Sequence, residues 1–167
     1  MVLNHPIRPI GPEPSLDVLL PCSMMWARPE DALAAAESAD VDDFRNPAAR
    51  TVFPVLVSLL NAGRPHDPTA VADELARRGL LTEPVKRFLL DATTAGAQAN
   101  SLAPRFYATA LAAQAYRARF ESIGKALVEA AETFPEGDLL PLLRKAGTDA
   151  VRHARRLANL RGEEVAA

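Results

Sequence analysis

The sequence contains little of several residue types, and each shortage excludes a class of protein. Cys22 is the only cysteine among 167 residues, so the chain can form neither an intrachain disulfide nor a cysteine-based metal site. No apolar run approaches the roughly 18 residues that a membrane helix needs, so we expect no membrane partner. Prolines stand where a secretion signal has its apolar segment. These absences fit a cytoplasmic protein.

Aromatic residues and net charge are also low. Aromatics make up 5% of the chain, so the core is built mostly from Leu, Val and Ala. Alanine-rich segments with few β-branched residues favour helix over strand, and we predict an all-α fold. The net charge of −2 gives no broad attraction to nucleic acid or to anionic membranes.

Proline, glycine and the spacing of apolar residues divide the chain. Residues 1–14 are predicted to be a flexible proline-rich tail and residues 15–100 a globular helical head. Residues 101–162 are predicted to form a helical hairpin in the same domain, and residues 163–167 a disordered end. The architecture is a compact bundle of short helices followed by a long antiparallel αα-hairpin.

The first part of the head, residues 15–40, predicts one or two helices. Its bulkiest apolar residues, Met24, Met25 and Trp26, are expected in the core. Cys22 is expected beside them as a small buried hydrophobic residue.

Residues 42–79 are the most informative segment, because they predict two short helices joined by a Gly-x-Pro-x-Asp-Pro turn. Asn46 and Asp67 each precede a proline, which is the pattern of an N-cap followed by the first helical residue. Gly63 and Gly79 provide the left-handed residues at which such helices end. A third short helix follows at residue 82.

The hairpin is predicted from a heptad pattern. Ser101 is expected to cap its first arm, Pro135 and Gly137 interrupt the pattern, and Asp138 is expected to cap the second arm. Apolar residues spaced alternately four and three apart form a seam along each arm, and long helices joined by a short loop pack antiparallel. The seam residues are Leu102, Phe106, Thr109, Ala113, Tyr116, Phe120, Ile123, Leu127, Ala130, Phe134, Leu139, Leu143, Ala146, Ala150, His153, Leu157 and Leu160.

The hairpin has more apolar residues than two helices can bury. We therefore expect a second hairpin, from another copy of the chain, to pack against it. The predicted face for self-association or partner binding consists of Tyr107, Leu111, Tyr116, Phe120, Leu140 and Val151.

The order of these signals resembles the N-terminal domain of DnaB-type replicative DNA helicases. In that family an Asp-Phe pair precedes a helix that begins near His-Arg, and a Gly-x-Pro-x-Asp turn leads to a helix ending at Arg-x-Gly. The matching residues are Asp43-Phe44, Arg50, Gly63-Arg64-Pro65-His66-Asp67 and Arg77-Arg78-Gly79, followed by Ala99-Asn100 and Phe106-Tyr107. The family's arginine in the first hairpin helix is matched by Arg117 or Arg119, and we expect Arg50 and Asn100 to be structural clamps.

The resemblance implies a protein that does no chemistry and has no cofactor. In the family this domain dimerises through its hairpins into a collar on the helicase ring and offers surfaces to primase and loading factors. Gly124-Lys125 lacks the upstream glycine and the Ser/Thr of a phosphate-binding loop. We expect a stand-alone interaction module whose partners are itself, as a homodimer or higher oligomer, and a replicative helicase, primase or loader.

Two other kinds of site were considered. Asp42, Asp43, His66 and Asp67 could be read as metal ligands, but sequence proximity does not make side chains converge, and we expect no metal. His153 occupies a seam position, where it could fix the register, titrate near neutral pH, or form a local hydrogen bond.

The last helix is basic and supports an alternative function. Residues 139–162 hold six cations and one acid, a local charge of +5. The helix macrodipole favours cations at a C-terminus, which is one explanation. The other is a strip for DNA phosphates or an acidic partner, as in a small DNA-binding regulatory protein, although without interleaved aromatics DNA binds weakly if at all. Its candidate residues are Arg144, Lys145, Arg152, Arg155 and Arg156.

Overall fold

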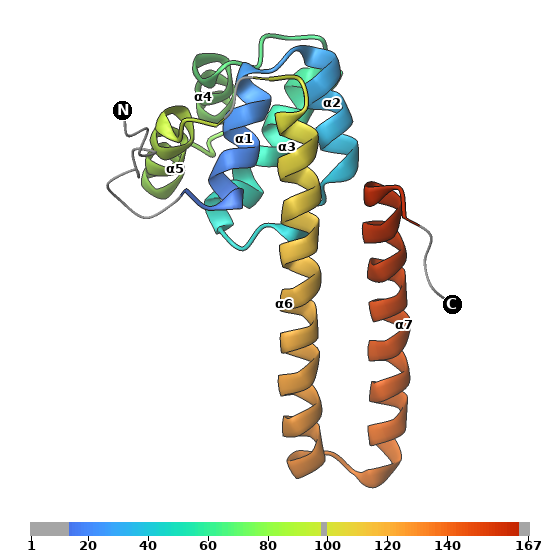
Figure 1. Cartoon of the computed structure of the whole chain (residues 1–167). Coiled ribbons are helices and arrows are strands. Elements are labelled where there is room, and N and C mark those ends of the chain that lie inside the picture. The colour runs from blue at the N-terminus through green and yellow to red at the C-terminus, as the bar shows by residue number, and fades with distance from the viewer. Residues whose placement is uncertain (1–13, 98–99, 164–167) are drawn as a thin grey trace, which may run out of the picture.

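The fold, taken from a computed structural model that describes residues 14–97 and 100–163, is a helical head with a long hairpin extending from it (Figure 1). Within these ranges every regular element is a helix, which confirms the all-α prediction. Most of the predicted tail and end lie outside the described residues. The elements are α1 (Leu16–Trp26), α2 (Pro29–Ser38), the 3-10 turn η1 (Val41–Asp43), α3 (Pro47–Asn61), α4 (Pro68–Arg77), α5 (Glu83–Thr94), α6 (Ala103–Thr133) and α7 (Glu136–Arg161).

The head is built around one apolar core. Helices α1, α2, α3 and α5 contribute apolar faces to it, and the first half of α6 packs against α1 and α2. Aliphatic side chains dominate, as the low aromatic content predicts, although Phe44 and Phe53 pack together with ring centroids 4.9 Å apart. The largest fully buried side chains include Phe44, Leu20, Met24, Leu56, Leu59, Leu75 and Leu111.

The predicted caps position the short helices. Asn46 Oδ1 accepts a hydrogen bond from the backbone N–H of Ala48 at 2.9 Å. Asp67 Oδ1 accepts from two backbone N–H groups, at 2.9 and 3.2 Å, in the first turn of α4. Gly63 and Gly79 have φ of +62° and +70°, as the left-handed ends of α3 and α4 require. The turn chemistry of residues 42–79 is confirmed.

Three local predictions were wrong. Asn100, not Ser101, caps α6, because its Oδ1 accepts from the N–H groups of Leu102 and Ala103 at 3.0 and 2.9 Å. Asp138 lies inside the first turn of α7 and is not its cap, since the helix begins at residue 136. Trp26 is 59% exposed at the end of α1, whereas its neighbours Cys22, Met24 and Met25 are buried as predicted.

The predicted heptad seam is only partly correct, even in the distal part of the hairpin, where the seam residues Phe134 and Leu143 are exposed and Leu142, outside the predicted seam, faces α6. There Ile123 and Leu127 of α6 line a small cavity together with Leu142 and Ala146 of α7. Nearer the head, α6 is held by another face, which carries the buried residues Ala108, Leu111, Ala112 and Ala115, because it packs against α1 and α2. Seam residues Leu102 and Phe106 are therefore exposed to solvent.

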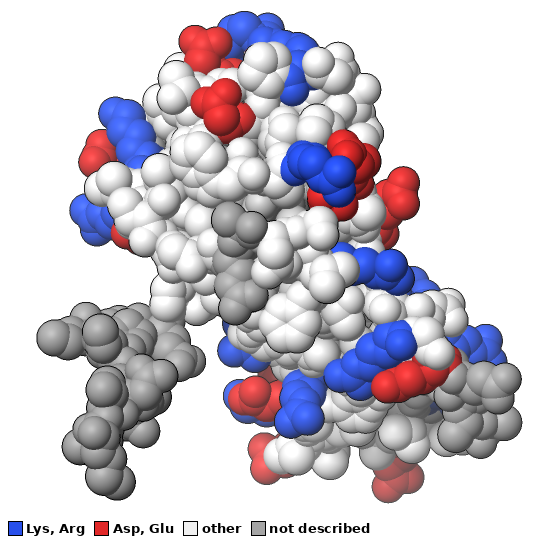
Figure 2. All heavy atoms as spheres, turned by 45° about the horizontal axis from the view of Figure 1, so that its top comes forward, with Lys and Arg blue, Asp and Glu red and all other residues white. Residues whose placement is uncertain are grey.

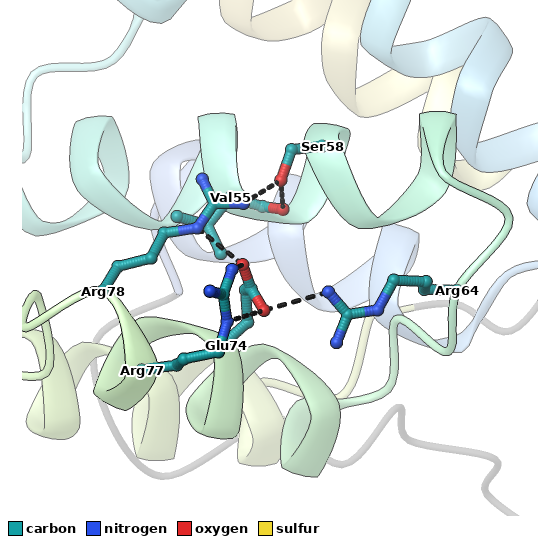
Figure 3. A network of polar contacts seen from close by, with 6 residues as sticks. All are labelled: Val55, Ser58, Arg64, Glu74, Arg77 and Arg78. Carbon is teal, nitrogen blue, oxygen red and sulfur yellow. Dashed lines mark hydrogen bonds and ion pairs between the residues drawn. The ribbon is translucent and has the colours of Figure 1, made fainter.

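A buried carboxylate holds α4 against α3 (Figure 3), and no local pattern in the sequence indicates this role. Glu74 is fully buried, and three guanidinium groups converge on it, from Arg64, Arg77 and Arg78. Arg78 also donates to Ser58 Oγ of α3 at 2.7 Å. Hydrogen bonds from Arg77 and Arg78 outweigh burial and hold the pKa of Glu74 far below its usual range. Two residues of the family-like Arg77-Arg78-Gly79 segment thus have a structural role.

We predict that Glu74→Gln destabilises the head, because it removes the charge that three arginines surround. The urea midpoint of unfolding, followed by circular dichroism, should fall clearly. The control is Glu83→Gln, whose exposed side chain pairs with Lys86 at 3.6 Å and should leave the midpoint almost unchanged. Equal midpoints for the two variants would contradict a structural role for the Glu74 cluster.

Candidate functional site

The hairpin is joined to the head by the carboxylate of Asp43, at the end of η1. Arg156 of α7 binds it through two nitrogens, with Nη1–Oδ1 and Nη2–Oδ2 distances of 2.9 and 2.6 Å. Arg119 of α6 reaches the same carboxylate at 3.2 Å. Arg156 Nη2 also donates to the carbonyl oxygen of Ser38, at the end of α2, at 2.8 Å. One head carboxylate therefore fixes both arms of the hairpin.

The environment of Asp43 explains why this contact is strong. Burial alone would raise the pKa of Asp43, but hydrogen bonds from Arg156, from the backbone N–H of Asp40 and from Arg119 outweigh it, so the pKa is lowered. A two-nitrogen arginine–carboxylate pair is geometrically specific as well as strong. Of the two arginines that could match the family's arginine, it is Arg119 and not Arg117 that contacts the head.

The expected clamps have local structural roles. Arg50 Nε donates to the carbonyl oxygen of Phe44 at 2.7 Å, which fixes the chain entering α3. Asn100 caps α6 as described above. Both contacts join residues close in sequence, so both residues shape the support of the hairpin.

Beyond the Asp43 contact, few side chains of the hairpin are buried by other parts of the chain. Only Leu157 is buried among the 26 residues of α7. In the distal half of α6 only Ala130 is buried. Large apolar side chains of both arms are exposed instead: Leu102, Phe106, Phe120, Val128, Phe134, Leu140, Leu143 and Val151.

The six residues of the predicted interaction face do not all lie on the surface. Leu111 is fully buried in the head core, so its assignment to this face was wrong. Tyr107 is half-buried and packs on the same core. Tyr116 is half-buried, and its ring meets that of Phe120 edge-on, with centroids 4.9 Å apart. Of the six predicted residues, Phe120, Leu140 and Val151 are exposed.

Several exposed apolar residues were missing from the predicted face. Phe106, Phe134 and Leu143 were assigned to the seam between the arms, and Val128 had no assignment. The signal that could have identified them is the excess of apolar residues over what two helices can cover. The sequence could not show which heptad positions face outward.

The basic residues of α7 do not form one free strip. Arg156 belongs to the Asp43 contact, so its assignment to DNA was wrong. Arg152 pairs with Asp149 at 3.2 Å. Arg144, Arg152 and Arg155 line a shallow groove of about 950 Å³ that α7 forms with Glu37 of α2. In the view of Figure 2, basic and acidic side chains lie interspersed on the surface.

His153 lies between the arms. It lines a cavity of about 220 Å³ with Tyr116, Phe120 and Arg152. Burial, and then repulsion from Arg119, Arg152 and Arg156, lowers the pKa of His153, although Asp43 opposes this. The surrounding arginines thus disfavour the protonated imidazole.

Three of the four residues considered as metal ligands are engaged elsewhere, and Asp42 is exposed. Asp43 binds arginines, Asp67 caps α4, and His66 Nε2 lies 3.1 Å from the carbonyl oxygen of Ala27. Among the residues that the structure describes, no three His, Cys, Asp or Glu side chains gather into a possible metal site. None of the described helices has the length and apolarity to cross a membrane.

We predict that Asp43→Asn lowers the free energy of unfolding at pH 7 by about 3 kcal/mol, because it leaves two partly buried arginines without their buried anion. The lowered pKa means that this stabilisation is present above the ordinary pKa of about 4 and is lost as the pH falls through the folded-state value. The variant should therefore show a flatter decline in stability between about pH 5 and pH 2.

The control for this measurement is Asp42→Asn, because Asp42 is adjacent and exposed. Urea unfolding at several pH values, with hydrogen exchange of α7 amides at pH 7, measures both effects. Loss of exchange protection in α7 is expected for Asp43→Asn alone. If the two variants behave alike, Asp43 does not anchor the hairpin.

The comparisons with known proteins agree with this architecture. Residues 22–112 match the family model described as DnaB-like helicase N terminal domain. The chain is similar to a crystal structure of the N-terminal domain of DnaB helicase from Mycobacterium tuberculosis, with a TM-score of 0.66 and 25% identity. That match covers 85% of this chain and 99% of the other. A search of curated proteins found no match. The chain belongs to the family of DnaB-like helicase N-terminal domains, the non-catalytic part of a replicative helicase.

Proposed function

We propose that this protein acts in DNA replication as a non-catalytic interaction module. It self-associates through the distal hairpin and binds a replicative helicase, a primase or a helicase loader. The family membership supports a helicase-associated role in replication. The partners and the mode of action are our proposal.

One observation carries this proposal. A 26-residue helix with a single buried side chain is not stabilised by its own chain in the way that a core helix is. Its arm partner α6 adds exposed apolar residues on the same distal stretch. Burial of such a surface against another protein is favourable at roughly 25 cal/mol per Å² of apolar area, so a partner hairpin suits it.

We predict a dimer or higher oligomer at tens of micromolar protein. The double variant Leu140→Glu/Leu143→Glu places charges on the exposed α7 face and should raise the dissociation constant at least tenfold, as measured by sedimentation equilibrium. The control is Leu90→Glu, since Leu90 is exposed as well, with an exposed fraction of 65%, but lies on α5 of the head. A wild-type protein that stays monomeric at high micromolar concentration contradicts self-association.

Partner binding needs a separate experiment. Immobilised protein should retain purified replicative helicase or primase from the same cell, and the Leu140→Glu/Leu143→Glu variant should retain less. If neither helicase nor primase is retained by the wild type, the helicase-associated role fails even if the protein is a dimer.

The alternative function, DNA binding through α7, is weakened by the contacts of its arginines. With Arg156 held by Asp43, Arg144, Lys145 and Arg155 remain as exposed cations. We predict only weak binding of single-stranded or duplex DNA at low salt, measured by fluorescence anisotropy, and its loss at 150 mM salt. Submicromolar binding that Arg144→Ala/Arg155→Ala abolishes would favour the DNA-binding regulator.

A further inference from the structure

His153 of α7 lies at the contact between the two arms of the hairpin. It is half-buried and lines a cavity of about 220 Å³ to which both arms contribute residues. Tyr116 and Phe120 of α6 line the same cavity, and their rings are in edge-on contact. Arg156, which ties α7 to the head, follows three residues later, one turn along α7. The imidazole is therefore next to both attachments of α7, to α6 and to the head.

The ionic groups around His153 are three cations and two anions, and the anions are already bound. They come from the three elements that meet there: Arg119 of α6, Arg152, Arg156 and Asp149 of α7, and Asp43 of η1. Asp43 binds Arg119 and Arg156, with N–O distances of 3.2 and 2.6 Å. Asp149 binds Arg152 at 3.2 Å. A proton on His153 would thus add a fourth positive charge to a cluster that already has one in excess.

His153 is also the member of this cluster that changes its charge near neutral pH. Histidine has an ordinary pKa of about 6.5, whereas aspartate and arginine titrate outside the range from about pH 5 to pH 7. Burial and the neighbouring arginines lower the pKa of His153, so the unfolded chain takes up the proton first. Stability that depends on the neutral imidazole is therefore present above about pH 6.5 and decreases as the pH falls below it. Asp43 keeps its charge in this range, because its pKa is lowered.

We infer that His153 makes the attachment of α7 sensitive to protons: the neutral imidazole lets α7 pack on α6 and the head, and protonation loosens it. The new charge lies between the arms, so repulsion from Arg119 acts across the α6–α7 contact. Repulsion from Arg156 acts beside the pair that this arginine forms with Asp43. The helix has little apolar packing to resist this, since Leu157 is the one buried residue of α7. The inference concerns the hairpin within one chain and does not depend on the proposed partners.

Hydrogen exchange of the α7 amides, corrected for the intrinsic rate at each pH, tests the inference. In the wild type, protection of α7 should decrease between about pH 7 and pH 5.5, while protection of α3 in the head core should be retained. His153→Gln keeps a polar side chain but cannot be protonated, so α7 should be equally protected at both pH values. The matched control is His66→Gln, because His66 is half-buried in the head, with Nε2 3.1 Å from the carbonyl oxygen of Ala27. This control should lose α7 protection as the wild type does.

Two further measurements keep the test independent of that one variant. His153→Lys places a permanent positive charge at the site, so its α7 amides should be poorly protected at both pH values. In the wild type, the ring proton signals of His153 report its protonation directly by NMR. The loss of α7 protection should have the same pH midpoint as this titration.

The possible outcomes are distinct. Loss of α7 protection that is present in the wild type and His66→Gln, absent in His153→Gln, and matched to the His153 titration supports the inference. Constant α7 protection in the wild type overturns it, and so does an equal loss in His153→Gln. Full protection of α7 in His153→Lys also overturns it, because a charge at this position would then be harmless.

Discussion

The position of the hairpin depends on one interaction, the binding of Asp43 by Arg119 and Arg156. These residues are 76 and 113 positions away from the carboxylate in sequence, so each contact closes a large part of the chain. The first half of α6 also packs on the head through apolar residues, whereas α7 packs mainly on α6. For α7, the guanidinium of Arg156 is thus the principal polar link to the head, through both Asp43 and the Ser38 carbonyl.

The head and the hairpin are stabilised in different ways. The head buries most of its aliphatic residues in one core and adds the Glu74 cluster, all within one chain. The distal hairpin keeps large apolar residues in water, which is the usual property of a surface reserved for another protein. The same helix, α6, serves both regions because its buried face changes along its length.

Helix caps and turns were predictable from the sequence. The packing faces of the helices and the ion pairs between residues distant in sequence were not. The caps at Asn46 and Asp67 and the glycine stops depend on neighbouring residues, so pattern and structure agree. Leu111 was misplaced because apolar residues occur on more than one face of α6, and only packing decides which face meets the head. The Arg156–Asp43 pair could not be found, since nothing local marks two charges so distant in sequence as partners.

The continuity of α6 has a mechanical consequence. Its 31 residues form one uninterrupted rod about 45 Å long, packed on the head at one end and joined to α7 at the other. Such a rod acts as a lever: a tilt of about 10° at its root would carry the tip through about 8 Å, given that length. Small adjustments of packing in the head can therefore become large displacements at the far end, without bending any helix.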